Sequence, residues 1–180
     1  MRPVKWYKGV APVAVFKDRQ VLGYKNGRLC KMDAEGKITN ICSLPRSFFE
    51  RITESSRLLR RMFRRDVRCA CFSASGDVFF FKDKTLYRYA DTRLQKICPP
   101  EQGMSAPLNI APALEASGYE VLWGDYSSND DRREVRIWGA GPDGTAAVVY
   151  RFPAGCLRHV HNIIPDRKGN GYYILTGDND

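Results

Sequence analysis

The feature that most constrains this chain is a repeated pattern of short apolar strands and tight turns. Residues 29–45 resemble residues 86–100, with aligned positions 56 to 57 residues apart. A third copy occupies residues 135–153, and a fourth begins at residues 161–175. Repeats at intervals of about 50 residues are typical of β-propellers, in which each repeat forms one four-stranded blade.

Each repeat is predicted to fold as an antiparallel meander. In the first copy the pair Asn26-Gly27 is the strongest hairpin signal, because both residues accept a positive φ. The four expected strands cover residues 13–16, 20–24, 28–32 and 37–44. We therefore expect an all-β chain that forms one domain over residues 1–180. Its expected fold is a partial β-propeller with about three four-stranded blades and the start of a fourth.

About three blades and the start of a fourth are too few to close a propeller, because propellers carry at least four blades around a closed ring. The chain is therefore expected to be the N-terminal part of a longer propeller, or to self-associate through its open blade edges. An open edge presents unpaired backbone N–H and C=O groups, to which another strand can add.

One insert interrupts the strands between the first and second repeats. Ser47 and Glu50 form a capping-box pattern and an apolar stripe follows, so an amphipathic helix is expected over about residues 47–65. Eight arginines and three acidic residues between positions 46 and 68 give this segment a net charge of +5, out of +9 for the chain. The basic surface of the helix would be formed by Arg57, Arg60, Arg61, Arg64 and Arg65.

This basic helix has two interpretations. It could neutralise nucleic-acid phosphates or anionic lipid headgroups. The segment lacks interleaved aromatic stacking residues, however, and no nucleic-acid-binding motif occurs elsewhere in the sequence. We therefore favour a solvated helix face over a nucleic-acid or membrane partner.

Composition and motifs exclude several classes of protein. No apolar run approaches the roughly 20 residues that span a bilayer, and no secretion signal is recognised, so a cytoplasmic protein is expected. None of the six cysteines forms a C-x-x-C pair, and all lie in apolar segments, which favours reduced, buried thiols over a zinc ribbon. Walker, Gly-x-Gly-x-x-Gly and His-Glu-x-x-His patterns are missing, so neither a cofactor nor a metal is expected.

The candidate ligand site centres on the two histidines of the chain, His159 and His161. Their i, i+2 spacing places both on one face of a strand, where they could bind a polar ligand, act as acid and base, or bind a metal. A metal would need a third ligand, which Asp125 or Asp178 could supply if the fold brought either near. Alternatively, both histidines only pack and satisfy backbone carbonyls.

Three further residues complete the candidate set. Asp125 and Arg133 flank a polar loop, and propeller loops carry binding residues such as an arginine for a carboxylate or phosphate. The sequence of this loop is also compatible with an ordinary solvated hairpin tip that contains local ion pairs. Asp178 belongs to a short acidic stretch that has oxygen ligands of the calcium-loop type but lacks the loop's Gly and Glu.

Residues 124–138, 150–161 and 176–178 resemble bacterial BNR/Asp-box, sialidase-like β-propellers. The nearest match to an Asp box is residues 141–145, which keep Asp and Gly but lack the leading Ser and the terminal Trp. The resemblance implies a propeller that binds carbohydrate. The arginine cluster, the Tyr/Glu pair and the acid of sialidases cannot be placed on this sequence, so the catalytic residues are unknown.

Functions of different classes remain open. The first is a non-catalytic binding or scaffold module, for carbohydrate or another small polar ligand. The alternative is a glycoside hydrolase of the exo-sialidase type, of which the chain would be an incomplete portion. A lesser alternative is membrane or nucleic-acid contact through the arginine-rich helix. Paired carboxylates beside an arginine cluster would favour the enzyme.

Overall fold

The computed structural model describes residues 10–15, 20–55, 59, 67–97, 105–166 and 168–177. The chain divides into two compact units, Met1–Asp66 and Val67–Asp180. A single domain over residues 1–180 stays a prediction. In the part of the chain that the structure describes, no helix is long and apolar enough to cross a membrane.

The first unit contains one antiparallel sheet whose strands follow each other in chain order. The turn between the second and third strands is formed by Asn26 and Gly27, with φ of 48° and 75°, as predicted. Leu22 and Tyr24 point to one side of the second strand and are buried, so this side faces the core. The strands are β1 (Ala11–Val15), β2 (Val21–Lys25), β3 (Arg28–Met32) and β4 (Ile38–Ser43).

The helix that follows, α1, spans Phe48–Ser55. Its capping box is confirmed, because the Ser47 backbone N–H donates to the Glu50 carboxylate and the Glu50 N–H donates to Ser47 Oγ. Apart from residue 59, the remainder of the helix predicted to residue 65 lies outside the described residues. The predicted basic surface falls there too, namely Arg57, Arg60, Arg61, Arg64 and Arg65.

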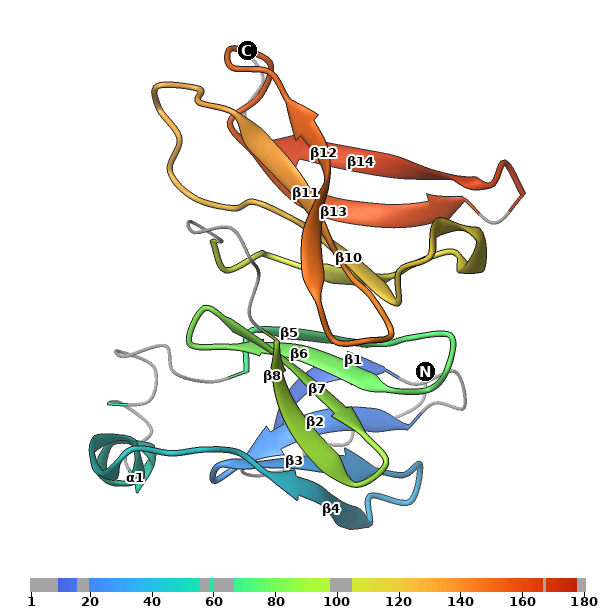
Figure 1. The fold of residues 1–180 in the computed structure, drawn as a ribbon. Coiled ribbons are helices and arrows are strands. Elements are labelled where there is room, and N and C mark those ends of the chain that lie inside the picture. The colour runs from blue at the N-terminus through green and yellow to red at the C-terminus, as the bar shows by residue number, and fades with distance from the viewer. Residues whose placement is uncertain are drawn as a thin grey trace, which may run out of the picture. The chain divides into compact units, whose positions relative to one another are not determined.

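The second unit repeats the meander (Figure 1). One blade consists of β5 (Cys69–Phe72), β6 (Val78–Lys82), β7 (Thr85–Ala90) and β8 (Arg93–Ile97). The next consists of β9 (Ile110–Pro112), β10 (Val121–Gly124), β11 (Val135–Ala140) and β12 (Ala146–Phe152), with a 3-10 turn at Glu115–Ser117 between its first two strands. A two-stranded sheet of β13 (His159–Asp166) and β14 (Gly171–Gly177) follows.

These sheets form a partial β-propeller, as predicted. The first strands of successive sheets are neighbours, since β5 contacts β9 and β9 contacts β13. The aligned repeats coincide with equivalent strands, because residues 29–32, 86–89 and 135–138 fall in β3, β7 and β11. Neighbouring strands run antiparallel, so the start of a first strand lies beside the end of a second strand. We call this end of the second unit, where β5 and β13 begin and β10 ends, the site end.

Aromatic residues fill the space between the blades of the second unit. Trp123 on β10 and Trp138 on β11 are fully buried and stack with ring centroids 6.4 Å apart. Phe81 on β6 meets Trp123 edge-on at 5.5 Å. Such contacts add to the burial of large apolar area and fix one blade against the next. A second cluster, including Leu122, joins β10 and β11 to β13.

The described cysteines are all free thiols. Cys30, Cys69 and Cys71 are buried and Cys42 is half-buried, in agreement with their apolar segments. Cys156 is exposed, so the expectation of burial is wrong there. It lies in the turn between β12 and β13, where no neighbouring strand covers it.

Candidate functional site

A long loop distinguishes the third blade from the first two. In those blades the second and third strands are joined by two-residue turns, Asn26-Gly27 and Asp83-Lys84, whose residues all have positive φ. In the third blade, residues 125–134 take the place of the turn. The added length brings polar side chains to the site end.

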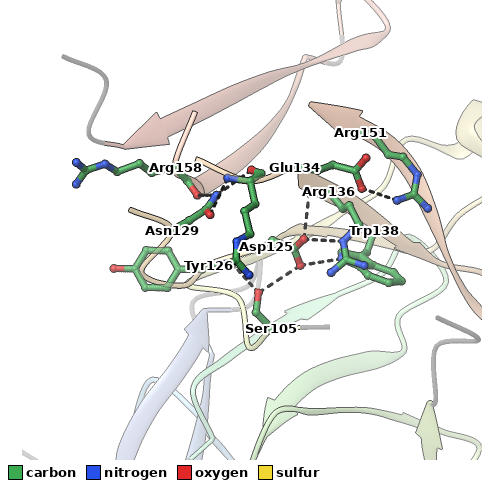
Figure 2. Close-up of polar contacts among 10 residues, drawn as sticks. Ser105, Asp125, Tyr126, Asn129, Glu134, Arg136, Trp138, Arg151 and Arg158 are labelled. Atoms are coloured by element: carbon green, nitrogen blue, oxygen red, sulfur yellow. Dashed lines mark hydrogen bonds and ion pairs between the residues drawn. The ribbon is translucent and has the colours of Figure 1, made fainter. Parts of the chain in front are cut away.

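Asp125 begins this loop and fixes it to the blade (Figure 2). Its Oδ1 accepts hydrogen bonds from Trp138 Nε1 at 3.0 Å and from Ser105 Oγ at 3.2 Å. Its Oδ2 accepts from the Arg136 backbone N–H at 3.1 Å and from Arg136 Nε at 2.9 Å. Both oxygens of this nearly buried carboxylate are thus engaged, and its geometry is that of a structural anchor.

Asn129 organises the middle of the loop. Its Nδ2 donates to the carbonyls of Arg133 and Arg158, at 2.9 and 3.0 Å, and its Oδ1 accepts from the Arg133 N–H. The loop is therefore tied to the residue that precedes β13. The Arg133 side chain is 81% exposed and pairs with Asp131, so it lies at the loop tip.

His159 and His161 lie at the start of β13, with their Nε2 atoms 2.9 Å apart and their rings stacked. Gly177 on β14 faces His159, and a Cβ at this position would collide with the His161 ring and lie 2.8 Å from His159 Nε2. An alanine here would therefore force at least one of the two imidazole rings to move. An N–H···N bond needs a hydrogen on one Nε2 and a lone pair on the other, so the two rings can share one proton.

Tyr126 connects this histidine pair to another blade. Its ring meets His159 edge-on at 4.7 Å and lies 5.8 Å from the His161 ring. On the same tyrosine ring lies Arg68, with Cζ 5.3 Å from the centroid. Arg68 precedes β5, so residues from three successive sheets meet at the site end.

A hollow of about 300 Å³ opens beside these residues and is lined by residues 126–130, Arg158 and His159. Its walls present hydroxyl, amide, carboxylate, guanidinium and imidazole groups, which suit a polar small molecule. A larger hollow of about 440 Å³ lies over β7 and β8. We favour the smaller one, because Arg88 in the larger is already bound to Asp77 and to the Pro142 carbonyl.

The structure brings together three of the sequence candidates, His159, His161 and Asp125, at the site end. Arg133 is nearby in sequence, but its side chain is exposed and pairs with Asp131, and Asp178 lies outside the described residues. Among the residues that the structure places, no group of three or more His, Cys, Asp or Glu side chains could hold a metal ion. The absence of a metal and of a cofactor stays a prediction.

Sequence reasoning missed Arg68, Ser105 and the role of Tyr126. Their contacts join segments far apart in the chain, and no short motif contains them. One signal was present, because Arg68 and Arg158 occupy the same position in the repeat, directly before a first strand. Aligning the repeats by their first strands would have placed both arginines at the site end.

The chain resembles propellers of known structure over nearly its whole length. A virginiamycin B lyase from Staphylococcus aureus matches with a TM-score of 0.62 and 17% identity, over 95% of this chain and 50% of that chain. A catalytically inactive histidine-to-alanine variant of the S. aureus lyase, solved with quinupristin, matches with a TM-score of 0.59 and 17% identity, over 93% and 49%. A protein assigned as a gluconolactonase matches with a TM-score of 0.54 and 12% identity, over 91% and 54%.

At these identities the likeness establishes the β-propeller fold, and the chain spans about half the length of these structures. No protein-family model matches the chain, and no curated protein does.

The similar structures are lyase- and lactonase-type propellers, so the resemblance to BNR/Asp-box sialidases is wrong. The expectation of carbohydrate binding loses its support with it. The degenerate Asp box is a general strand-joining turn: residues 141–145 close with the same pair of backbone hydrogen bonds as residues 33–37 and 73–77. A turn of this kind carries no family-specific information.

Proposed function

We propose that the chain forms part of a β-propeller enzyme that opens a lactone or a related cyclic ester, with His159 and His161 as its proton-transferring pair. The similar protein assigned as a gluconolactonase supports this class of reaction, and the similar lyase supports an enzymatic role for the fold. The inactive histidine variant of the lyase supports a histidine as the essential group in that fold.

The observation that carries the proposal is the 2.9 Å separation of the two Nε2 atoms, beside a polar hollow. One imidazole accepts the proton that the other donates, so the pair can take up a proton and return it without a large movement. His159 is buried, and His161 is half-buried and therefore nearer to solvent. Histidine is also the side chain best suited to proton transfer near neutral pH.

Hydrolysis of a lactone fits this arrangement. Water adds to the carbonyl carbon while the pair accepts a proton from it, and the ring C–O bond then breaks. The departing alkoxide takes a proton back, and the product is a hydroxy acid that ionises to its carboxylate. Each proton therefore passes through one acid–base pair, which such chemistry requires.

The test is the initial rate at which the 180-residue chain opens gluconolactone and quinupristin. His159→Gln and His161→Gln should each lower the rate about 100-fold or more, the usual effect of removing a general acid or base. Circular dichroism should show that both variants keep the strand content of the wild type. Full activity in either variant would overturn the proposal, and so would a folded wild-type chain that opens neither compound.

A second candidate is the non-catalytic ligand-binding module, and one observation favours it. Asp125 is engaged by four hydrogen bonds, so it is not a free carboxylate that could assist the histidines. This candidate predicts ligand-dependent shifts of the histidine NMR signals without turnover.

A further inference from the structure

Arg68 differs from most arginines of the second unit in having no acidic partner. Five others face a carboxylate, namely Arg88, Arg133, Arg136, Arg151 and Arg158. The Arg68 side chain is exposed, and within the described residues it makes no ion pair. Its positive charge is therefore uncompensated at the site end.

The position of this charge is fixed by its neighbours. The Arg68 backbone N–H donates to the Phe81 carbonyl at 2.9 Å, which holds Arg68 beside the C-terminal end of β6. Its guanidinium lies over the Tyr126 ring, a cation–π contact that restrains a long side chain. Tyr126 is itself held, because its backbone N–H donates to Ser105 Oγ at 2.9 Å.

The same tyrosine ring touches His159 and lies near His161. A single aromatic ring thus separates an uncompensated cation from the proposed proton-transferring pair. Arg158 lines the hollow as a second cation. Asp130 lies 3.8 Å from its Nη1, and the buried Nε of Arg158 has no hydrogen-bond partner among the described residues. Arg68 and Arg158 therefore both have donors left for a ligand, and of the two Arg68 is the one that no carboxylate of the described residues faces.

We propose that Arg68 anchors the carboxylate of a small hydroxy acid beside the histidine pair. The planar guanidinium fork matches a carboxylate with two parallel N–H···O bonds, and one positive charge balances one negative charge. This assignment rests on the proposed function, whose product is a hydroxy acid. The assignment adds to that function the class of ligand, a hydroxy acid, and a residue that selects this class.

The chain offers a direct reporter for such binding, because it contains only two histidines. Their Cε1–H signals in a ¹H–¹³C spectrum can be followed while gluconate, glucose or inorganic phosphate is added to the 180-residue chain. Gluconate carries the proposed carboxylate, glucose is a neutral polyol of similar size, and phosphate is an anion of different shape. We expect gluconate to shift the signals saturably and glucose to leave them unchanged.

Arg68→Gln should raise the Kd for gluconate about tenfold or more, as expected for losing a charge-assisted hydrogen bond. The control is Arg93→Gln, which removes an exposed arginine on β8 and should leave the Kd unchanged. Equal Kd values for wild type and Arg68→Gln would overturn the proposal. Phosphate binding as tight as gluconate would overturn the carboxylate assignment.

The readout separates this proposal from the proposed function. Saturable gluconate binding that depends on Arg68, in a chain that opens no lactone, would support the anion site and contradict the catalytic function. Lactone opening that depends on the histidines but not on Arg68 would support the catalytic function and contradict the anion site.

Discussion

The indole N–H of Trp138 donates to Oδ1 of Asp125 at 3.0 Å, which joins the inter-blade core to the loop of the candidate site (Figure 2). Trp138 is fully buried and stacks on Trp123, whereas Asp125 is the first residue of the loop. Core packing on β11 thus determines where the loop, and with it Tyr126, begins.

Replacing Trp138 by Phe should destabilise the second unit more than replacing Trp123 by Phe. Both indoles are fully buried, but Trp123 Nε1 has no hydrogen-bond partner among the described residues, while Trp138 Nε1 donates to a carboxylate. The difference in the free energy of unfolding should be about 2 kcal/mol, the usual contribution of a hydrogen bond to a charged group. Urea unfolding measures it, and equal losses would contradict the anchoring role.

Asp125→Asn should lower the free energy of unfolding by about 3 kcal/mol, because it removes the charge that pairs with the largely buried Arg136. Asp131→Asn is the matched control, since it breaks the exposed Arg133 pair and should change stability by about 0.5 kcal/mol or less. Urea unfolding of both variants at pH 7 compares them directly. A loss below about 1 kcal/mol for Asp125→Asn would show that the anchor contributes no more than a surface pair.

Among the five cysteines that the structure describes, thiol reagents should react first with Cys156. Burial raises the pKa of Cys69 to about 12 and that of Cys42 to about 11, and it also raises the pKa values of Cys71 and Cys30. At pH 8 these four thiols hold little of the reactive thiolate, whereas Cys156 is exposed. Cys156→Ser should remove one thiol from the fast phase with Ellman's reagent, and an unchanged fast phase would place Cys156 in a covered position.

Asp166 should make stability depend on pH through the turn between β13 and β14. Hydrogen bonds from the backbone N–H groups of Gly169 and Lys168, and from the Tyr173 hydroxyl, lower its pKa. Because the folded state favours the ionised form, this contribution is present above the unfolded pKa of about 4 and is lost as pH falls through the lowered value.

Asp166→Asn should therefore lower the Tm at pH 7 and have a smaller effect near pH 2. Thermal melts of both proteins at the two pH values measure the difference. An effect of equal size at both would mean that the carboxylate charge has no part in the turn.

Local patterns allowed much of the fold to be predicted. The Asn26-Gly27 turn, the Ser47–Glu50 cap and the recurring strands depend on residues close in sequence, so their physics is visible in a short window. The predicted family was wrong, because the turn at residues 141–145, on which it partly relied, also joins other strand pairs of this chain. The i, i+2 spacing also placed both histidines on one face correctly.

The rest of the site depends on contacts between distant segments. Arg68 meets Tyr126 only because β5 and β10 reach the same end of adjacent sheets. The role of Asp125 as an anchor was not predicted either, since one of its partners, Ser105, lies well before it in the sequence and the other, Trp138, lies well after it. Such partners are determined by packing of blades, which a single sequence does not display.

The most direct test of the histidine pair compares Gly177→Ala with Gly171→Ala. The first adds a methyl group that would collide with the His161 ring and lie 2.8 Å from His159 Nε2, so at least one imidazole must move. The second adds the same group on the same strand, where the nearest atom beyond its chain neighbours is 4.0 Å away. Neither change removes a functional group. We expect Gly177→Ala to lose about 100-fold in the rate of lactone opening and Gly171→Ala to retain the wild-type rate. Equal rates for the two variants, with both chains folded, would contradict the central role of the histidine pair.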